Sequence, residues 1–441
     1  MAEMKAGYKQ TDIGVIPEDW DVAALGNLFE ITSSKRVFQN EWRKSGVPFY
    51  RARELAVLGE KGKVDNDLFI DHELYEKHKR SYGVPEVGDV LVTGVGTLGK
   101  VYVVPDDTAF YFKDGNIIWF KVRKKLNSYF LKQLYYTPLI EYQISESSAG
   151  STVGTYTITG AKKTLIPLPK PEEQKQIAAA LSDVDGLIEA LSQLITKKRD
   201  MKTAAMQQLL TGKKHLPGFE EKNGCKETDI GVIPEDWDIK QLGSLGGFAK
   251  GSGIKKDEAQ SGTLPCVRYG ELYTKHHDVI RRFYSFISEK VSKNSKKLKY
   301  GDILFACSGE TKEEIGKCAS FLDKGQAYAG GDIIILSPHS DDAEFLGYFL
   351  NSDKIAQQKS SLGQGDAVVH INAKSLASIP IPLPKPEEQK AIASVLSDMD
   401  TEIDALEQRL AKALNLKTGM MQELLTGKTR FIKTDKKQEA A

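Results

Sequence analysis

The chain has 441 residues, 40% of them hydrophobic, which is enough for two or three domains with buried cores. Its 61 Lys and Arg residues nearly balance its 60 Asp and Glu residues, for a formal net charge of +1. A nucleic-acid binder usually has a basic excess, so any such face must be locally basic, or part of the affinity must come from partners. The sequence has no run of about eighteen apolar residues and no signal-peptide core, so we expect a soluble, cytoplasmic protein with no membrane partner.

Three phrases occur twice along the chain. Residues 11–21 recur unchanged as 228–238, residues 167–175 recur as 382–390, and the pattern Gln-x-Leu-Leu-Thr-Gly-Lys ends both at Lys213 and at Lys428. The chain is therefore a unit of about 215 residues written twice, whereas solenoid repeats span about 20–50 residues. Two whole domains with matched connecting elements are expected.

The repeat predicts the following domain order. A first domain with an N-terminal arm spans 1–166, a first helix 167–213, a linker 214–227, a second domain 228–381, a second helix 382–428 and a polar tail 429–441. Short β-rich runs at 89–93, 101–104 and 116–122 precede an aromatic helical stretch at 129–144, so each domain is expected to be mixed α/β. The edges of the two copies are nearly identical while the middles diverge, which suits two different recognition surfaces in one frame. Neutral drift after duplication is the alternative, but drift should erode edges and middles alike.

The clearest predicted elements are two long helices. Pro171 and Pro386, each followed by two glutamates, suit a first helical turn, and Gly212 and Gly427 mark the ends. Apolar residues spaced 4-3-4-3-4 form an a/d seam in each helix: Ile177, Leu181, Val184, Ile188, Leu191 and Ile195, then Ile392, Leu396, Met399, Ile403, Leu406 and Leu410. We expect the two seams to pack together as an antiparallel coiled coil. The alternative is that each helix packs on its own domain.

The frame Thr-Asp-Ile-Gly-x-Ile-Pro-x-x-Trp, a variable domain, then Ile-Pro-Leu-Pro-x-Pro-x-x-Gln and a long helix, all repeated, resembles the specificity (S) subunit of type I restriction-modification systems. The resemblance covers residues 7–428. It implies two target recognition domains, each reading one half of a split double-stranded DNA sequence, and helices that act as a spacer and dock modification subunits, expected to number two. It also implies restriction subunits as partners and no catalysis or cofactor on this chain. S-adenosylmethionine, ATP and magnesium would belong to the partner subunits.

Two patterns invite an enzymatic interpretation. Gly94-Val-Gly-Thr-Leu-Gly99 matches a dinucleotide fingerprint, but a strand-like run follows it where that motif needs a helix. Asp236, Asp238 and Lys240 could belong to a nuclease cluster, but the first copy has Asp21-Val-Ala at that place, so docking of the arm is favoured. The four cysteines and seven histidines show no metal-ligand spacing, and we expect neither a metal site nor catalytic residues.

Four places in each half carry residues suited to phosphate or base contact on loops. They are a polar loop, an Arg pair or Arg-Tyr pair, a Gly-rich turn, and the polar loop before the second proline motif. In the first half the candidates are Lys35, Arg36, Arg51, Arg53, Thr97, Lys100, Ser151, Thr152, Thr155 and Tyr156; in the second they are Lys250, Ser252, Lys255, Lys256, Arg268, Tyr269, Ser308, Lys312, Gln364 and Asp366. Each also suits an ordinary solvated loop.

Three functions are compatible with these patterns. The first is a DNA sequence-specificity subunit with two reading domains. The second is a self-contained methyltransferase or nuclease, whose motifs are absent from the sequence. The third is a non-DNA scaffold, which the near-neutral charge favours.

Overall fold

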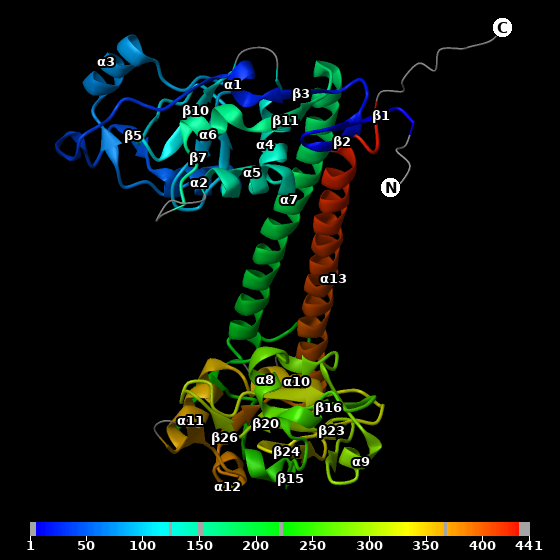
Figure 1. Cartoon of the computed structure of the whole chain (residues 1–441). Helices are drawn as coiled ribbons and strands as arrows, with labels where there is room; N and C mark the ends of the chain where they lie inside the picture. The colour runs from blue at the N-terminus through cyan, green and yellow to red at the C-terminus, as the bar shows by residue number, and fades with distance from the viewer. Residues whose placement is uncertain (1–5, 123–125, 149–153, 220–223, 366–367, 432–441) are drawn as a thin grey trace. The chain divides into compact units, whose positions relative to one another are not determined.

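The computed structural model describes residues 6–122, 126–148, 154–219, 224–365 and 368–431. It consists of two compact units (Figure 1): unit 1 comprises Met1–Ser192 and Gln408–Ala441, and unit 2 comprises Gln193–Glu407. Each unit holds one globular domain and a segment of each of the two 39-residue helices, α7 (Pro171–Leu209) and α13 (Pro386–Leu424). Among the described residues, no helix is long and apolar enough to cross a membrane.

The core of unit 1 is an antiparallel sheet in the order β4-β10-β7-β8. Its strands are β4 (Glu30–Thr32), β10 (Ile117–Lys121), β7 (Val90–Thr93) and β8 (Val101–Val103). The two central strands are rich in β-branched and aromatic residues and are buried on both faces. Val90 and Phe120 pack into one cluster with Phe130, whereas Leu91 and Trp119 pack into another. Alternation along the strands thus separates two cores.

Smaller elements complete unit 1. A second sheet has the order β6-β5-β9, with β5 and β9 parallel. Two antiparallel pairs join β1 to β2 and, between strands far apart in sequence, β3 to β11. These strands are β1 (Tyr8–Thr11), β2 (Gly14–Pro17), β3 (Asp21–Ala24), β5 (Val47–Tyr50), β6 (Phe69–Ile70), β9 (Tyr111–Phe112) and β11 (Leu165–Leu168). The helices are α1 (Leu25–Leu28), η1 (Gln39–Glu41), α2 (Ala52–Lys61), α3 (His72–Tyr82), α4 (Ser128–Tyr135), α5 (Pro138–Ser148) and α6 (Ile158–Lys163).

Unit 2 repeats this plan with one strand more in its main sheet. The order is β15-β24-β20-β22-β17, in which β17 pairs parallel to β22, and a second sheet has the order β18-β16-β23-β19. The strands of the two sheets are β15 (Gly246–Lys250), β16 (Leu264–Val267), β17 (Asp278–Ile280), β18 (Ser285–Ile287), β19 (Lys296–Lys297), β20 (Ile303–Ala306), β22 (Cys318–Phe321), β23 (Tyr328–Ala329) and β24 (Ile333–Pro338). Three further pairs are formed by β12 (Cys225–Thr228) with β13 (Gly231–Pro234), β14 (Asp238–Gln241) with β26 (Pro380–Leu383), and β21 (Ser308–Gly309) with β25 (Val369–His370).

Seven short helical segments are described in unit 2. They are η2 (Leu242–Ser244), η3 (Lys256–Glu258), α8 (Tyr269–Thr274), α9 (Glu289–Ser292), α10 (Ala343–Phe349), α11 (Asp353–Leu362) and α12 (Ala373–Ala377). Of these, α10 and α8 contact the main sheet. The shared strand order of the two units confirms the predicted class: two mixed α/β domains built from an internal repeat.

The long helices lie side by side within each unit. In unit 1, Lys417 of α13 pairs with Asp185 of α7 at 2.7 Å. In unit 2, Lys198 pairs with Glu402 at 2.7 Å and Lys202 pairs with Asp400 at 2.7 Å. As the residue numbers in α7 rise, the numbers of their partners in α13 fall. The segments therefore run antiparallel, as predicted.

The seam is shared between two kinds of contact. Ile177 and Leu181 belong to the core of their own domain, and Ile392 and Leu396 do the same in unit 2. Farther along, Leu191, Ile195, Ile403 and Leu406 are also buried, while Val184, Ile188, Met399 and Leu410 are half-buried. Each helix therefore packs on its own domain in its first turns, as in the alternative, and its middle part packs against the other helix.

The repeated phrases at the chain's edges meet in space. In unit 1, the fully buried Trp20 belongs to one cluster with Leu424 and Leu425 from the end of α13. The Tyr8 hydroxyl donates to the Gly427 carbonyl oxygen at 3.0 Å. We call this contact of an arm with a helix end the clasp.

Unit 2 contains the equivalent clasp, in which Trp237 packs with Leu209 and Leu210 from the end of α7. Gly212 and Gly427 both have positive φ, +66° and +70°, as expected for residues that follow a helix. Each arm thus packs against the end of a helix that starts in the other copy of the repeat, which explains why both edges are preserved.

Candidate nucleic-acid interface

One turn of unit 1, residues 113–116 between β9 and β10, is the point where the predicted loops meet. The Gly94 N–H donates to the Asn116 carbonyl oxygen at 2.8 Å, and the Lys113 N–H donates to the Tyr50 carbonyl oxygen at 2.9 Å. The Arg36 guanidinium lies 2.9 Å from the Asp114 carboxylate. The polar loop, the end of β5 directly before the Arg pair and the Gly-rich turn therefore all contact this one turn, which we call the hub.

The fourth predicted place joins the same group. Val95 and Thr155 form an antiparallel bridge, and the Tyr156 N–H donates to the Gly94 carbonyl oxygen at 2.9 Å. The Gly-rich turn and the loop before the second proline motif are thus held together by main-chain hydrogen bonds. Four segments that are far apart in the sequence lie together at one end of the domain.

Unit 2 builds the same arrangement around residues 329–333. The Cys307 N–H donates to the Asp332 carbonyl oxygen at 3.0 Å, and the Gly251 N–H donates to the Ile333 carbonyl oxygen at 2.8 Å. Ser308 pairs with His370, as Val95 pairs with Thr155 in unit 1. Because two divergent domains preserve this geometry, it belongs to the frame rather than to one surface.

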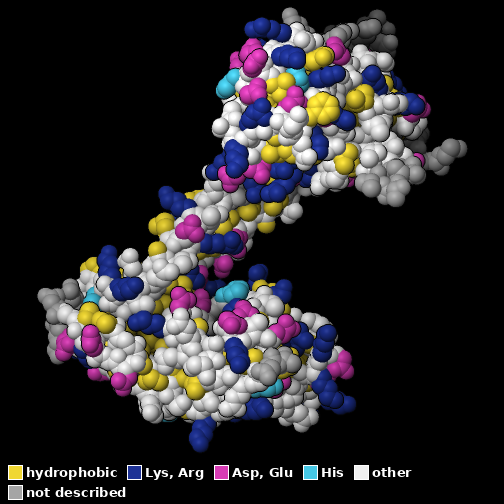
Figure 2. Space-filling view, turned by 90° about the vertical axis from the view of Figure 1, so that its left-hand side faces the viewer, with side chains coloured by type: hydrophobic (Ala, Val, Ile, Leu, Met, Phe, Trp, Pro, Cys, Tyr) yellow, Lys and Arg dark blue, Asp and Glu magenta, His cyan; other side chains and the backbone are white. Residues whose placement is uncertain are grey.

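The charged candidates fall into two groups. Arg36 keeps 66% of its side chain exposed, and Arg53, Thr97, Lys250, Ser252, Lys255, Lys256, Lys312 and Gln364 are also exposed, as is Tyr269 at 42%. On the face shown in Figure 2, Lys and Arg side chains are interspersed with Asp and Glu on both units. This mixture fits the net charge of +1 and a basic character that is local to particular loops.

Other candidates also make contacts within their own domain, as the exposed Arg36 does with Asp114. Arg51 precedes α2 and lies 2.7 Å from Glu54 and 3.0 Å from Asp67; the hydrogen bond to Glu54 raises its pKa. Arg268 stands at the same place before α8, 3.5 Å from Glu271. Lys100 lies 2.6 Å from Glu60, and Lys35 lies 5.2 Å from the ring centre of Tyr82. These cations are therefore held by contacts within their own domain.

Two candidates are corrected by their burial. Tyr156 is 2% exposed, and its hydroxyl lies 2.8 Å from that of Thr164, so it cannot reach a DNA groove. Ser308 is 7% exposed, and its hydroxyl lies 2.9 Å from His370 Nδ1. We remove both from the proposed interface. Ser151, Thr152 and Asp366 lie outside the described residues, and Thr155 is half-buried.

The sequence reasoning missed the hub residues as candidates. Lys113, Asp114 and Asn116 lie in a short segment that is similar in the two copies of the repeat. In it, Lys113-Asp-Gly-Asn-Ile corresponds to Ala329-Gly-Gly-Asp-Ile. That match was itself the available signal. Asp332 also has a positive φ of +58°, a conformation unusual for a residue other than glycine.

The two patterns that invited an enzymatic interpretation have structural roles instead, as the sequence favoured. Residues 94–99 are followed by strand β8 and not by a helix, so no helix N-terminus faces a phosphate there. Asp236 lies 3.7 Å from His215 in the clasp, and Lys240 lies 3.8 Å from Asp341. Within the described residues, no group of three or more His, Cys, Asp or Glu residues could hold a metal ion.

Comparisons with a family model and with known proteins all identify type I restriction-modification specificity subunits as similar to this chain. The model of the type I restriction modification DNA specificity domain matches residues 17–197 and again residues 234–416. A putative type I restriction enzyme MjaX specificity subunit from Methanocaldococcus jannaschii is 28% identical over 443 residues, covering 97% of each chain. The MjaVIII specificity subunit of the same organism is 27% identical, covering 94% of each chain.

A solved structure has the same fold. The crystal structure of the S subunit of a type I restriction-modification system from M. genitalium superposes with a TM-score of 0.61 at 16% identity, covering 96% of this chain and 99% of that chain. The duplicated domains, their long helices and both family matches agree. The chain belongs to the type I restriction modification DNA specificity domain family, and it carries that domain twice.

Proposed function

We propose that this chain reads a bipartite double-stranded DNA target, with one recognition domain for each half-site, and performs no catalysis itself. The observation that carries the proposal is the repeated hub, where four divergent polar segments converge on one end of each domain. Base readout needs polar side chains on elements that reach a groove, and phosphate contacts need lysines and arginines beside them. The exposed loops around each hub supply both.

The long helices are proposed to dock two modification subunits, with restriction subunits joining the complex. S-adenosylmethionine, ATP and magnesium would then be bound by those partners. Two leucines of α7, Leu187 in unit 1 and Leu194 in unit 2, are 45% and 38% exposed and would be accessible to such a partner.

A domain exchange tests the proposal. Residues 22–165 would be replaced by the equivalent segment of a relative, and the chain expressed with its modification subunits in a host that lacks them. Sequencing of modified bases then yields the target. Exactly one half-site is expected to change, because each variable core sits in its own constant frame. A simultaneous change of both half-sites would contradict the proposal.

Salt dependence separates this function from that of a scaffold for other proteins. Neutralised phosphates release counterions, so the logarithm of DNA affinity should fall steeply with the logarithm of salt concentration. A scaffold would show weak DNA binding at every salt concentration and no modified sequence in the host genome.

A further inference from the structure

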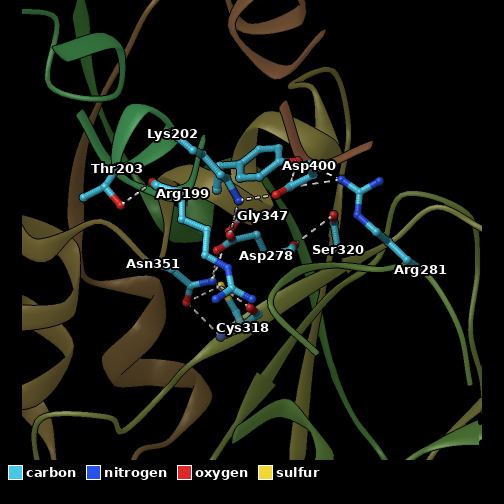
Figure 3. Close-up of polar contacts among 11 residues, drawn as sticks. Arg199, Lys202, Thr203, Asp278, Arg281, Cys318, Ser320, Gly347, Asn351 and Asp400 are labelled. Carbon is cyan, nitrogen blue, oxygen red and sulfur yellow. Dashed lines mark hydrogen bonds and ion pairs between the residues drawn. The ribbon is translucent and has the colours of Figure 1, made fainter. Parts of the chain in front are cut away.

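A partly buried group of charges in unit 2 joins both long helices to the recognition domain (Figure 3). Lys202 of α7 points between two carboxylates, with its Nζ 2.7 Å from Asp400 Oδ1 of α13 and 3.4 Å from Asp278 Oδ2 of β17. The three side chains are only 15–19% exposed. Shielded ion pairs of this kind hold geometry more strongly than pairs in open solvent, because salt and water screen them less.

Asp400 receives two more donors from the domain. The Tyr348 hydroxyl of α10 donates to Asp400 Oδ2 at 2.7 Å, and Arg281, just after β17, lies 3.1 Å from the same oxygen. Burial and the nearby Asp400 carboxylate raise the pKa of Tyr348, so its hydroxyl stays a donor. One helix carboxylate is therefore bonded to the neighbouring helix, to α10 and to the end of β17.

Asp278 is held in an unusual conformation at this place. Its φ is +54°, and its other carboxylate oxygen, Oδ1, accepts a hydrogen bond from Asn351 at 3.0 Å. Gly347 passes so close that an added Cβ would lie 2.2 Å from the Asp278 carbonyl oxygen. A positive φ is strained for residues other than glycine and persists where the surroundings fix it.

Unit 1 builds a simpler version of the same contact. Lys417 pairs with Asp185 at 2.7 Å, and the Gln133 amide donates to Asp185 at 2.8 Å. Asp185 is 36% exposed, against 19% for Asp400. Asp278 lies in β17, the fifth strand of the main sheet of unit 2, and Arg281 directly follows that strand. Among the residues that the structure describes, the main sheet of unit 1 has four strands and no counterpart of β17. The domain of unit 2 thus makes more charged and polar contacts with the long helices at this place than the domain of unit 1 does.

We propose that Lys202, Asp278, Arg281, Tyr348 and Asp400, which we call the helix anchor, are positioning residues that make DNA recognition strict in spacer length. This inference rests on the proposed reading of a bipartite target. A domain fixed to its helices meets its half-site at only one separation and one rotation along the duplex. A domain that turns on its helices follows the half-site through neighbouring spacer lengths.

Removing the lysine charge tests the anchor. Lys202→Met keeps the aliphatic stem but leaves two carboxylates facing each other, and Lys417→Met is the matched control in unit 1. Each variant is assembled with the modification subunits. Its affinity is then measured for three duplexes: the target of the wild-type complex and the same target with one base pair added to or removed from the spacer.

The preference of Lys202→Met for the native spacer is expected to fall about fivefold, in the range of coupling between contacting residues. Lys417→Met is expected to change that preference less than about twofold. Lys202→Arg, which keeps the positive charge, should retain the wild-type preference for the native spacer. Asp278→Asn, which tolerates a positive φ, should lower it in the same direction and decides the case if Lys202→Met does not assemble.

Three results would overturn the proposal. The first is an unchanged spacer preference in Lys202→Met and Asp278→Asn, and the second is an equal loss in Lys417→Met. The third is a uniform loss of affinity for all three duplexes, accompanied by a lower melting temperature, because that result describes a group that only stabilises the fold. If the wild-type complex itself binds no bipartite duplex, the proposed function fails first, and the two failures are distinguished.

Discussion

Replacing either clasp glycine by alanine should destabilise its unit severely. In Gly427→Ala the new Cβ would lie 2.4 Å from Pro17 Cγ and 3.2 Å from Trp20 Cη2, and the backbone would keep a φ of +70°. The positive φ costs about 1–2 kcal/mol for a residue with a Cβ. Overpacking against two rigid rings adds about 1–3 kcal/mol, which makes the total about 2–5 kcal/mol.

The second clasp repeats the prediction independently. In Gly212→Ala the Cβ would lie 2.3 Å from Pro234 Cγ and 3.2 Å from Trp237 Cζ2, at a φ of +66°. Gly186 provides the matched control, because it lies within α7 and an added Cβ there would meet nothing within 4 Å. Alanine should stabilise the helix at that position by about 0.5–1 kcal/mol.

Urea unfolding followed by tryptophan fluorescence measures both effects, since Trp20 and Trp237 are buried in the two clasps. Two compact units need not unfold in one step, so the midpoint of the affected transition is compared rather than one global free energy. Gly427→Ala and Gly212→Ala should lower a midpoint, and Gly186→Ala should leave it equal or higher. Wild-type midpoints in both clasp variants would refute the reasoning.

Three further predictions concern DNA contact, pH and spacing. Arg36→Ala should weaken DNA binding and reduce the salt slope by about one while stability stays within about 0.5 kcal/mol. Arg51→Ala should instead lower the melting temperature, because it leaves the buried Glu54 carboxylate without its guanidinium partner. The hydrogen bond from Arg430 lowers the pKa of Asp19, so this pair stabilises unit 1 above about pH 4 and its contribution is lost as the pH falls through the lowered pKa. Asp19→Asn should remove that part of the acid sensitivity of the urea midpoint. Inserting one heptad after Leu194 and another after Arg409 lengthens each helix by about 10 Å. The unread spacer in the modified-base motif should then grow by about three base pairs, and an unchanged spacer would show that the helices do not set it.

The elements with local periodicity were predictable from sequence. The two long helices follow from heptads and caps that lie within one segment, and the duplicated α/β plan follows from the repeat. Which part of each apolar seam packs on a domain and which part packs on the other helix was not predictable, because Ile177 and Ile392 pack on residues that are distant in sequence.

The candidate interface was predictable only in part. Loop composition identified segments that do converge, but burial is a tertiary property, so Tyr156 and Ser308 could not be told apart from exposed neighbours. The intradomain contact of Arg51 was predictable, since Arg-x-x-Glu at the start of a helix occurs in both copies, as Arg51 with Glu54 and as Arg268 with Glu271. That spacing predicts a capping contact.

The composition of unit 1 sets an order for folding during synthesis. Unit 2 is continuous in sequence, from Gln193 to Glu407, whereas unit 1 combines the first 192 residues with Gln408–Ala441. Trp20 therefore leaves the ribosome roughly 400 residues before Leu424 and Leu425, a delay of roughly 20–80 s at common elongation rates of roughly 5–20 residues per second. The domain that is made first is the last to be closed, and its apolar arm is exposed to chaperones and proteases throughout that interval.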